Sequence, residues 1–245
     1  MDVGWPKELF LIRHAESAGN LARERALSAG AAVIDIAVRD CDVPLSDLGE
    51  RQATALGEWC ARHIEPIDVV VSSPYVRAQE TATLALRAAG WDVPAIVDER
   101  LREKEFGMLD RLTRAGIEQK FPEQAELRRV LGKFYYRPPG GESWTDVILR
   151  LRSVLDTLTR EHGGKRVAIV SHQVIVLCFR YLLERLDEAR LLAIDAEGDV
   201  ANCSVTTYRL DAQADRLVLR TYNVVTPMQE AGEPVTRRPD VRLAR

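Results

Sequence analysis

Glu8-Leu-Phe-Leu-Ile-Arg-His14 is the most informative stretch of this chain, because an apolar run ends in it abruptly at an arginine and a histidine. A short apolar run without alternation predicts a strand that is covered on both faces, as the strands of a parallel sheet are. Three more stretches have this form. They are Asp68-Val-Val-Val71, followed by Ser72-Ser-Pro74; Arg166-Val-Ala-Ile-Val170, followed by Ser171-His172; and the weaker Ala95-Ile-Val-Asp98.

Helical patterns separate these predicted strands. Alternation of strands and helices is typical of an α/β fold with a mainly parallel sheet. We therefore expect a three-layer sandwich, with helices on both faces of the central sheet. The predicted helices start at Ser46, at Tyr75 (with Gly90 as the stop), after the box Ser143-Trp-Thr-Asp146 and at Val174, and a late hairpin is predicted over residues 203–208 and 216–222.

The alternation predicts a single domain over residues 1–225. Residues 108–142 interrupt it with two short helical patterns and a Pro- and Gly-rich stretch, which predicts a small lid insertion that covers the site. Residues 226–245 contain three prolines, four arginines and little apolar periodicity. They predict an extended C-terminal tail.

The polar residues that follow the predicted strands indicate a ligand site. In open parallel sheets, ligands bind beyond the carboxyl ends of the strands. His14 and His172 are each predicted to lie at such a place, directly after a buried strand. Arg13 precedes the first of them, and Arg77 lies near the start of a helix that faces the same edge. The forked donors of arginine suit phosphate oxygens. This constellation predicts a phosphate site.

Histidines and arginines together can carry out phosphoryl transfer. A neutral imidazole is a competent nucleophile near physiological pH, and arginines stabilise the transferred charge. The leaving oxygen needs a proton, so a carboxylic acid must lie nearby. The candidates are in Leu101-Arg-Glu-Lys-Glu-Phe-Gly107, where position alone does not choose between Glu103 and Glu105.

Five ordered segments of the chain resemble the histidine phosphatase superfamily, also called phosphoglycerate mutase-like. In that family the first segment usually reads Arg-His-Gly-Glu-Ser-x-x-Asn, and the last usually reads Ser-His-Gly. The segments are Leu11-Ile-Arg-His-Ala-Glu-Ser-Ala-Gly-Asn20, Pro44-Leu-Ser-Asp-Leu-Gly-Glu-Arg-Gln-Ala53, Ser72-Ser-Pro-Tyr-Val-Arg-Ala-Gln-Glu-Thr-Ala82, Leu101-Arg-Glu-Lys-Glu-Phe-Gly107 and Val170-Ser-His-Gln173.

The resemblance implies a role for each matched residue. His14 would be the nucleophile that becomes phosphohistidine, and Arg13, Arg77 and His172 would surround the phosphoryl group. Glu103 matches the family's proton donor, whereas Glu105 does not.

The same resemblance implies which residues meet the substrate. Ser17 and Asn20 would lie at the substrate and phosphate edge, and we place Gln173 beside them. The chain departs from the family pattern at Ala15 and Gln173, where glycine is usual. Since glycine permits positive φ or close backbone approach, we expect some change in pocket shape without loss of the chemistry.

The resemblance implies a metal-independent phosphatase of the histidine acid phosphatase type that needs no cofactor. Its expected substrate is a small phosphorylated metabolite. Mutase chemistry is the alternative, but the form of the segment at 101–107 and Gln52 are more similar to the phosphatase branches. A non-catalytic phosphate-binding or scaffold protein is a second alternative. It is disfavoured because the nucleophile, both arginines and the acid are all present.

A zinc hydrolase is a third possibility that the spacing of residues disfavours. His63 and His162 form no H-x-H or H-E-x-x-H pattern, so both are predicted to be structural. The cysteines are widely spaced, without a C-x-x-C pair, and we expect reduced thiols. They are Cys41, Cys60, Cys178 and Cys203.

Composition excludes several classes of protein. The chain has 245 residues, of which 46% are hydrophobic, and its 34 Lys+Arg and 37 Asp+Glu leave a formal net charge of −3. This composition excludes a wholly disordered chain, and the lack of a basic excess argues against a nucleic-acid partner. No stretch approaches the roughly 18–20 apolar residues of a membrane helix, and the first residues are unlike a secretion signal. We expect a cytoplasmic protein without a membrane partner, and the sequence carries no signal for an oligomeric state.

Overall fold

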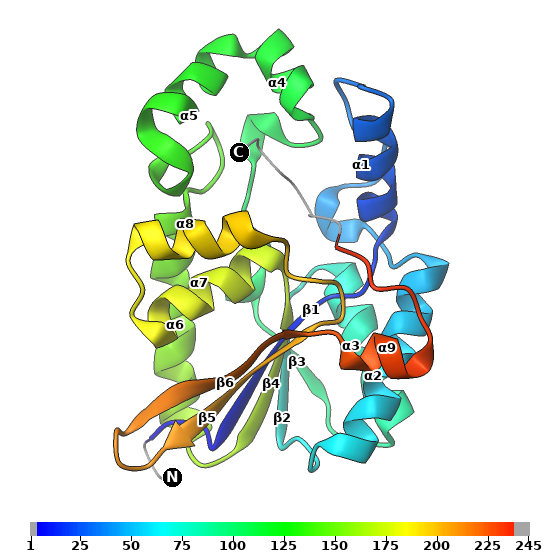
Figure 1. The fold of residues 1–245 in the computed structure, drawn as a ribbon, viewed down its shortest axis with the longest axis vertical. Coiled ribbons are helices and arrows are strands. Elements are labelled where there is room, and N and C mark those ends of the chain that lie inside the picture. The colour runs from blue at the N-terminus through cyan, green and yellow to red at the C-terminus, as the bar shows by residue number, and fades with distance from the viewer. Residues whose placement is uncertain (1–3, 238–245) are drawn as a thin grey trace.

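The computed structural model describes residues 4–237, which contain a six-stranded sheet in the order β3-β2-β4-β1-β5-β6 (Figure 1). The first four strands in this order are mutually parallel, β5 runs antiparallel to β1, and β6 runs antiparallel to β5. The predicted α/β class is therefore confirmed. The strands are β1 (Glu8–Arg13), β2 (Val69–Ser72), β3 (Ala95–Val97), β4 (Arg166–Ser171), β5 (Val205–Asp211) and β6 (Arg216–Val224).

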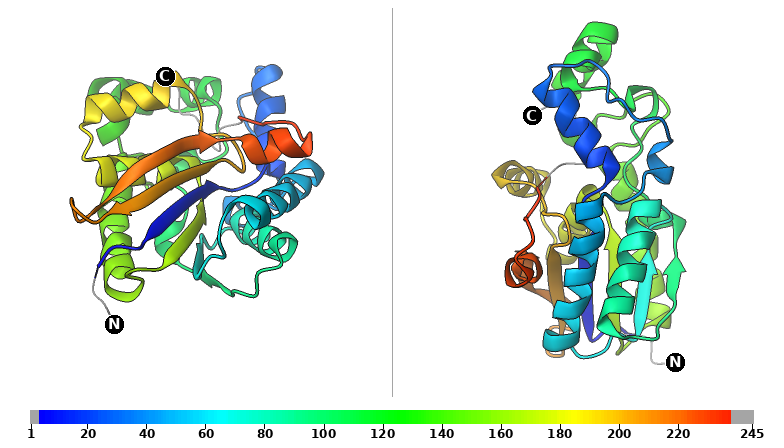
Figure 2. Two further views of the ribbon diagram at one scale, coloured as in Figure 1. Left: turned by 60° about the horizontal axis from the view of Figure 1, so that its bottom comes forward. Right: turned by 90° about the vertical axis from the view of Figure 1, so that its right-hand side faces the viewer.

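Helices cover both faces of this sheet, which explains why β1 is apolar without alternation (Figure 2). Leu9 and Leu11 pack into a core with helices α6 (Trp144–Glu161) and α7 (Gln173–Glu184). Phe10 and Ile12 pack into a second core with α2 (Asp47–His63) and α3 (Val76–Ala89). Because each face of β1 meets a helical layer, all four side chains are at most 6% exposed.

The predicted helix starts are confirmed at two serines. Ser46 caps α2, where its side chain accepts a hydrogen bond from the backbone N–H of Gly49. Ser143 begins α6 with a complete capping box, in which Asp146 takes the position usual for Glu. Gly90 ends α3 in the left-handed region at φ 68°.

We predict that Ser143→Ala lowers the free energy of unfolding by about 1 kcal/mol, since the variant loses the hydroxyl that accepts from the Asp146 backbone N–H at 3.1 Å. Helix α6 carries the apolar stripe of the first core, so its fraying loosens that core. Urea denaturation measures the change. Ser28→Ala, at the exposed end of α1, is the control and should stay within about 0.5 kcal/mol. Equal losses in both variants would contradict a role for the cap.

Further elements of the fold are the late hairpin, two helices and three short 3-10 helices. The late hairpin is confirmed as β5 and β6. Strand β5 starts at residue 205 instead of 203, and the two strands end at residues 211 and 224 instead of 208 and 222. The sequence analysis did not identify α8, although Asp187 caps it. The remaining elements near the sheet are α1 (Ala18–Ser28), α8 (Glu188–Glu197), and the short 3-10 helices η1 (Asp40–Asp42), η2 (Glu99–Leu101) and η3 (Gly107–Leu109).

Residues 108–142, the predicted insertion, lie beyond the carboxyl ends of the parallel strands (Figure 1). They contain α4 (Arg114–Lys120) and α5 (Pro122–Tyr135), which is kinked at Gly132 with φ 76°. This segment has a small core of its own, which includes Leu109, Ile117 and Tyr136. Between residues 4 and 237, no helix is both long and apolar enough to cross a membrane.

The tail predicted over residues 226–245 is not extended throughout. Residues Thr226–Ala231 form a short helix, α9, that packs on α2. The physical reason is Met228, whose side chain is fully buried in the second core. After the helix, Gln52 donates a hydrogen bond to the carbonyl of Pro234 at 2.9 Å. The part of the predicted tail that covers residues 238–245 lies outside the described residues.

Candidate active site

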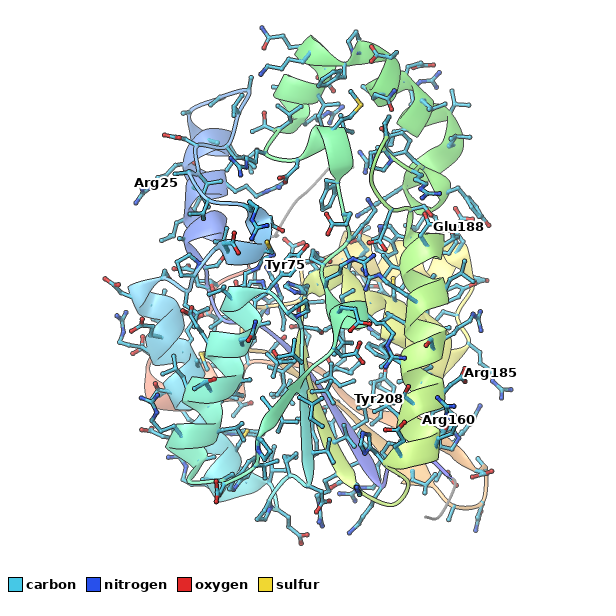
Figure 3. The ribbon with its side chains drawn as sticks, turned by 180° about the vertical axis from the view of Figure 1, so that it is seen from behind. Arg25, Tyr75, Arg160, Arg185, Glu188 and Tyr208 are labelled. Carbon is cyan, nitrogen blue, oxygen red and sulfur yellow. The ribbon has the colours of Figure 1, made fainter. Side chains whose placement is uncertain are left out.

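The candidate site lies where three neighbouring parallel strands end. Strands β2, β4 and β1 are adjacent, and Arg13 of β1 stands opposite Ser171 of β4. The polar residues that follow each strand therefore reach the same edge of the sheet. Tyr75, labelled in Figure 3, lies at this edge, between the sheet and the 108–142 segment. The structure thus brings together the predicted strand-end residues.

His14 is fully buried directly after β1. Its Nδ1 lies 2.6 Å from the carbonyl oxygen of Ala15. Because a carbonyl can only accept, we assign the proton to Nδ1, which leaves the lone pair on Nε2. The Nε–H of Arg77 donates to this Nε2 over 3.3 Å. The Nε2 lone pair of His14 thus points at an arginine, which would also attract a phosphoryl group.

His172 and Arg13 border His14 inside the protein. The His14 and His172 rings are 5.1 Å apart between centroids in an edge-to-face arrangement. His172 Nε2 lies 2.8 Å from the hydroxyl oxygen of Ser73, which follows β2. Arg13 is 0% exposed and donates from Nη1 to the carbonyl of Val200 at 2.5 Å. Because Arg13 is fully buried, it does not take part in a surface salt bridge.

Arg77 is held by Asp40, a residue that the sequence analysis missed. The guanidinium is 2% exposed and donates to the Asp40 carbonyl at 2.6 Å and to its carboxylate at 3.2 Å. The Asp40 side chain is 38% exposed at the start of η1. No motif singles out this aspartate, and only the fold brings residue 40 to residue 77.

We predict that Asp40→Asn binds inorganic phosphate about fivefold more tightly, because a carboxylate on Arg77 repels a second anion by roughly 1 kcal/mol. The asparagine carbonyl and the unchanged backbone still accept from Arg77. Isothermal titration with phosphate gives the dissociation constant, with exposed Asp92→Asn as the control. Weaker binding in Asp40→Asn would mean that the carboxylate orients Arg77 more than it competes with phosphate.

The two candidate acids occupy different environments after β3. Glu103 is 2% exposed and accepts a hydrogen bond from the backbone N–H of Lys104 at 2.8 Å. The Glu105 side chain is 45% exposed and accepts from the Tyr75 hydroxyl at 2.9 Å. Burial of Glu103 fits an acid that is removed from solvent, whereas Glu105 is a surface group.

Lys104 adds a buried cation that the sequence analysis did not consider. It is 5% exposed, and its ammonium lies 4.3 Å from the centroid of the Phe106 ring. Burial lowers its pKa to about 8, although Glu103 and Glu142 oppose the shift. The acid segment therefore carries positive as well as negative charge.

Ser17 and Asn20 lie together with Arg77 and Asp40 around a small cavity at the start of α1. They form a capping box: Asn20 N–H donates to the Ser17 hydroxyl oxygen, and Ser17 N–H donates to Asn20 Oδ1. Gln173, the first residue of α7, is 6% exposed and donates to Asp199 Oδ1 at 2.9 Å. The structure thus places two of the three predicted substrate residues beside the arginine.

Ala15 and Gln173, which stand where the family usually has glycine, do not require an unusual backbone conformation. Neither Ala15 nor Gln173 is among the residues with positive φ. Ala15 is fully buried, and its N–H donates to the Thr81 hydroxyl at 3.0 Å. Both residues therefore adopt ordinary backbone conformations.

The remaining histidines and the cysteines lie in other surroundings. His63 stacks on Trp59 of the same helix, α2, and His162 caps the far end of α6. All four cysteines are free, and burial raises the pKa of the Cys60 thiol to about 12. Within residues 4–237, no group of three or more His, Cys, Asp or Glu side chains is arranged to hold a metal ion.

Comparisons with known proteins agree with this geometry. A model of the histidine phosphatase superfamily (branch 1) matches residues 9–224. The bifunctional protein Rv2228c of Mycobacterium tuberculosis is 34% identical over 220 residues, which are 89% of this chain and 55% of that protein. The chain therefore spans about half the length of that relative.

Two further similarities span almost the whole of the matched proteins. The 2,3-bisphosphoglycerate-dependent phosphoglycerate mutase 2 of Gloeobacter violaceus is 29% identical over 234 residues, 94% of this chain and 98% of the mutase. The structure of mycobacterial glucosyl-3-phosphoglycerate phosphatase Rv2419c with inorganic phosphate has a TM-score of 0.69 at 27% identity, covering 90% of this chain and 99% of that one. A phosphatase and a mutase are thus both similar to this chain.

Proposed function

This chain belongs to the histidine phosphatase superfamily, branch 1, and on that premise we propose that it hydrolyses phosphate monoesters of small metabolites through a phosphohistidine. The observation that carries the proposal is the state of His14. Its Nδ1 proton is engaged by the Ala15 carbonyl, and its Nε2 lone pair faces the Arg77 guanidinium. A buried imidazole in this tautomer is prepared to attack an anion that arginine attracts.

In the first step His14 Nε2 forms a bond to phosphorus as the bond from phosphorus to the leaving oxygen breaks. The Glu103 carboxylic acid donates its proton to that oxygen, so the product leaves as an alcohol. Arg13, Arg77 and His172 stabilise the charge on the three phosphoryl oxygens. Ser17, Asn20 and Gln173 border the substrate.

In the second step water attacks the phosphohistidine. The Glu103 carboxylate takes a proton from the water, the bond from phosphorus to Nε2 breaks, and inorganic phosphate leaves. These two steps regenerate neutral His14 and protonated Glu103. Each step uses side chains of this chain alone, so we propose a reaction that needs neither metal nor cofactor.

Mutase chemistry is the second candidate, favoured by the similarity to the Gloeobacter violaceus enzyme. The experiment that separates the two follows both products from a panel of phosphorylated metabolites, with a chelator present. Hydrolysis predicts inorganic phosphate and free alcohol in equal amounts. A phosphoryl group recovered on a second hydroxyl would overturn hydrolysis, and turnover that requires an added metal would overturn metal independence.

A further inference from the structure

We infer that Tyr75 is a positioning residue that couples the two halves of this site: its ring orders the phosphate-binding pair Arg77 and His172, and its hydroxyl anchors the segment that carries Glu103. The inference rests on the proposed function and extends it to a residue outside the predicted site. Tyr75 is 6% exposed and lies between the end of β2 and the start of α3.

The ring of Tyr75 contacts two of the proposed phosphate ligands. Its centroid is 5.1 Å from that of the His172 ring, in an edge-to-face arrangement. The Cζ of Arg77 lies over the face of the same ring, 4.9 Å from its centroid. Both geometries are attractive for an aromatic quadrupole, so one ring sets the position of an imidazole and a guanidinium.

The backbone of Tyr75 strengthens this arrangement. Its N–H donates to the Ser73 hydroxyl oxygen at 3.3 Å, and the same oxygen lies 2.8 Å from His172 Nε2. Ser73, Tyr75 and His172 therefore form a closed set of contacts. Because Ser73 and His172 follow different strands, these contacts join the ends of β2 and β4.

The hydroxyl of Tyr75 reaches the acid segment. It donates to Glu105 Oε1 at 2.9 Å, two residues after Glu103. Burial and the neighbouring Glu105 carboxylate raise the pKa of the tyrosine hydroxyl, so it keeps its proton and stays a donor. The backbone of Glu105 is in turn bonded to Glu142. Its carbonyl accepts from the Glu142 N–H at 2.9 Å, and its N–H donates to the Glu142 carboxylate at 3.1 Å. The position of the proposed acid thus depends on this tie.

The choice of tyrosine here has a structural cost. Residue 75 is the N-cap of α3, where Ser, Thr, Asp or Asn would accept a hydrogen bond from the helix, and Tyr75 makes no such side-chain bond. The local preference for a cap is therefore overridden. The contacts to His172, Arg77 and Glu105 supply a physical reason.

The ring is tested by titration with inorganic phosphate, which needs no turnover. We expect Tyr75→Leu to bind phosphate about tenfold more weakly, and Tyr75→Phe to stay within about twofold of the parent. Exposed Tyr135→Phe is the matched control for a lost hydroxyl. Parent-like phosphate affinity in a folded Tyr75→Leu would overturn the role of the ring.

The hydroxyl is tested by comparing an alkyl phosphate with nitrophenyl phosphate. Tyr75→Phe should lose about fivefold in kcat/KM on the alkyl ester, which needs an acid, and less than twofold on the activated ester. Glu105→Ala should act alike, and the double variant should lose no more than either single one. Equal losses on both esters, or additive losses, would overturn the anchor.

A third measurement separates this inference from the proposed reaction. Backbone amides of residues 103–106 should exchange hydrogen faster in Tyr75→Phe than in the parent, whether or not the chain is a hydrolase. Unchanged exchange there would refute the anchor. A parent protein that binds phosphate but turns over neither ester would instead refute the proposed function and leave both structural readouts in force. If Tyr75→Leu does not fold, Tyr75→Phe and Glu105→Ala still decide the outcome for the hydroxyl.

Discussion

His14→Ala is expected to lose about a thousandfold or more in kcat/KM, because the variant has no nucleophile to form the covalent intermediate. Of the other histidines, His63 and His162 lie on α2 and at the end of α6. His172 is beside His14, but its Nε2 is engaged with the Ser73 hydroxyl at 2.8 Å. Steady-state turnover of nitrophenyl phosphate measures the loss. His63→Ala, the same substitution on a half-exposed histidine, should keep the parent rate.

The same variant tests the intermediate directly. Rapid quench of the parent with labelled substrate should trap acid-labile phosphate on the His14 peptide, and His14→Ala should carry none. Arg77, which donates to Nε2, supplies the positive charge that draws the phosphoryl group to this nitrogen. Label on another residue, or equal turnover by His14→Ala, would contradict His14 as the nucleophile.

Glu103→Gln is expected to slow hydrolysis of alkyl phosphates by about 100- to 10,000-fold and of nitrophenyl phosphate by much less. An amide cannot donate a proton to the leaving oxygen, and an alkoxide needs that proton, whereas nitrophenolate is already a stable anion. Glu103 is only 2% exposed, so bulk water has little access to replace its carboxyl as the proton donor. The kcat/KM values for the two esters measure the difference.

Exposed Glu99→Gln, four residues earlier in the same segment, is the matched control and should change neither rate. Equal losses of Glu103→Gln on both esters would point to a role in binding or folding and contradict acid catalysis. Breakdown of the phosphohistidine offers an independent check, because the variant should also accumulate more trapped intermediate once an activated ester has formed it.

Much of the fold could be predicted from local pattern. The apolar runs before Arg13, Ser72 and Ser171 predicted three neighbouring parallel strands, because the middle of a strand that is covered on both faces is apolar. Ser143 and Asp146 marked the start of α6, since a capping box is a contact within four residues. The tail was less predictable, because Met228 can anchor it only through apolar contacts that exist once α2 lies beside it.

The sequence determined the α/β class and supplied the candidate residues His14, His172, Arg13 and Arg77, because strand patterns and short motifs are local. Only the family resemblance chose Glu103 over Glu105. Tertiary structure alone decided their partners. Asp40 on Arg77 and Tyr75 on Glu105 join positions 37 and 30 residues apart, and no spacing rule connects such residues before the chain folds. The tautomer of His14 likewise depends on where burial and the Ala15 carbonyl place its Nδ1 proton.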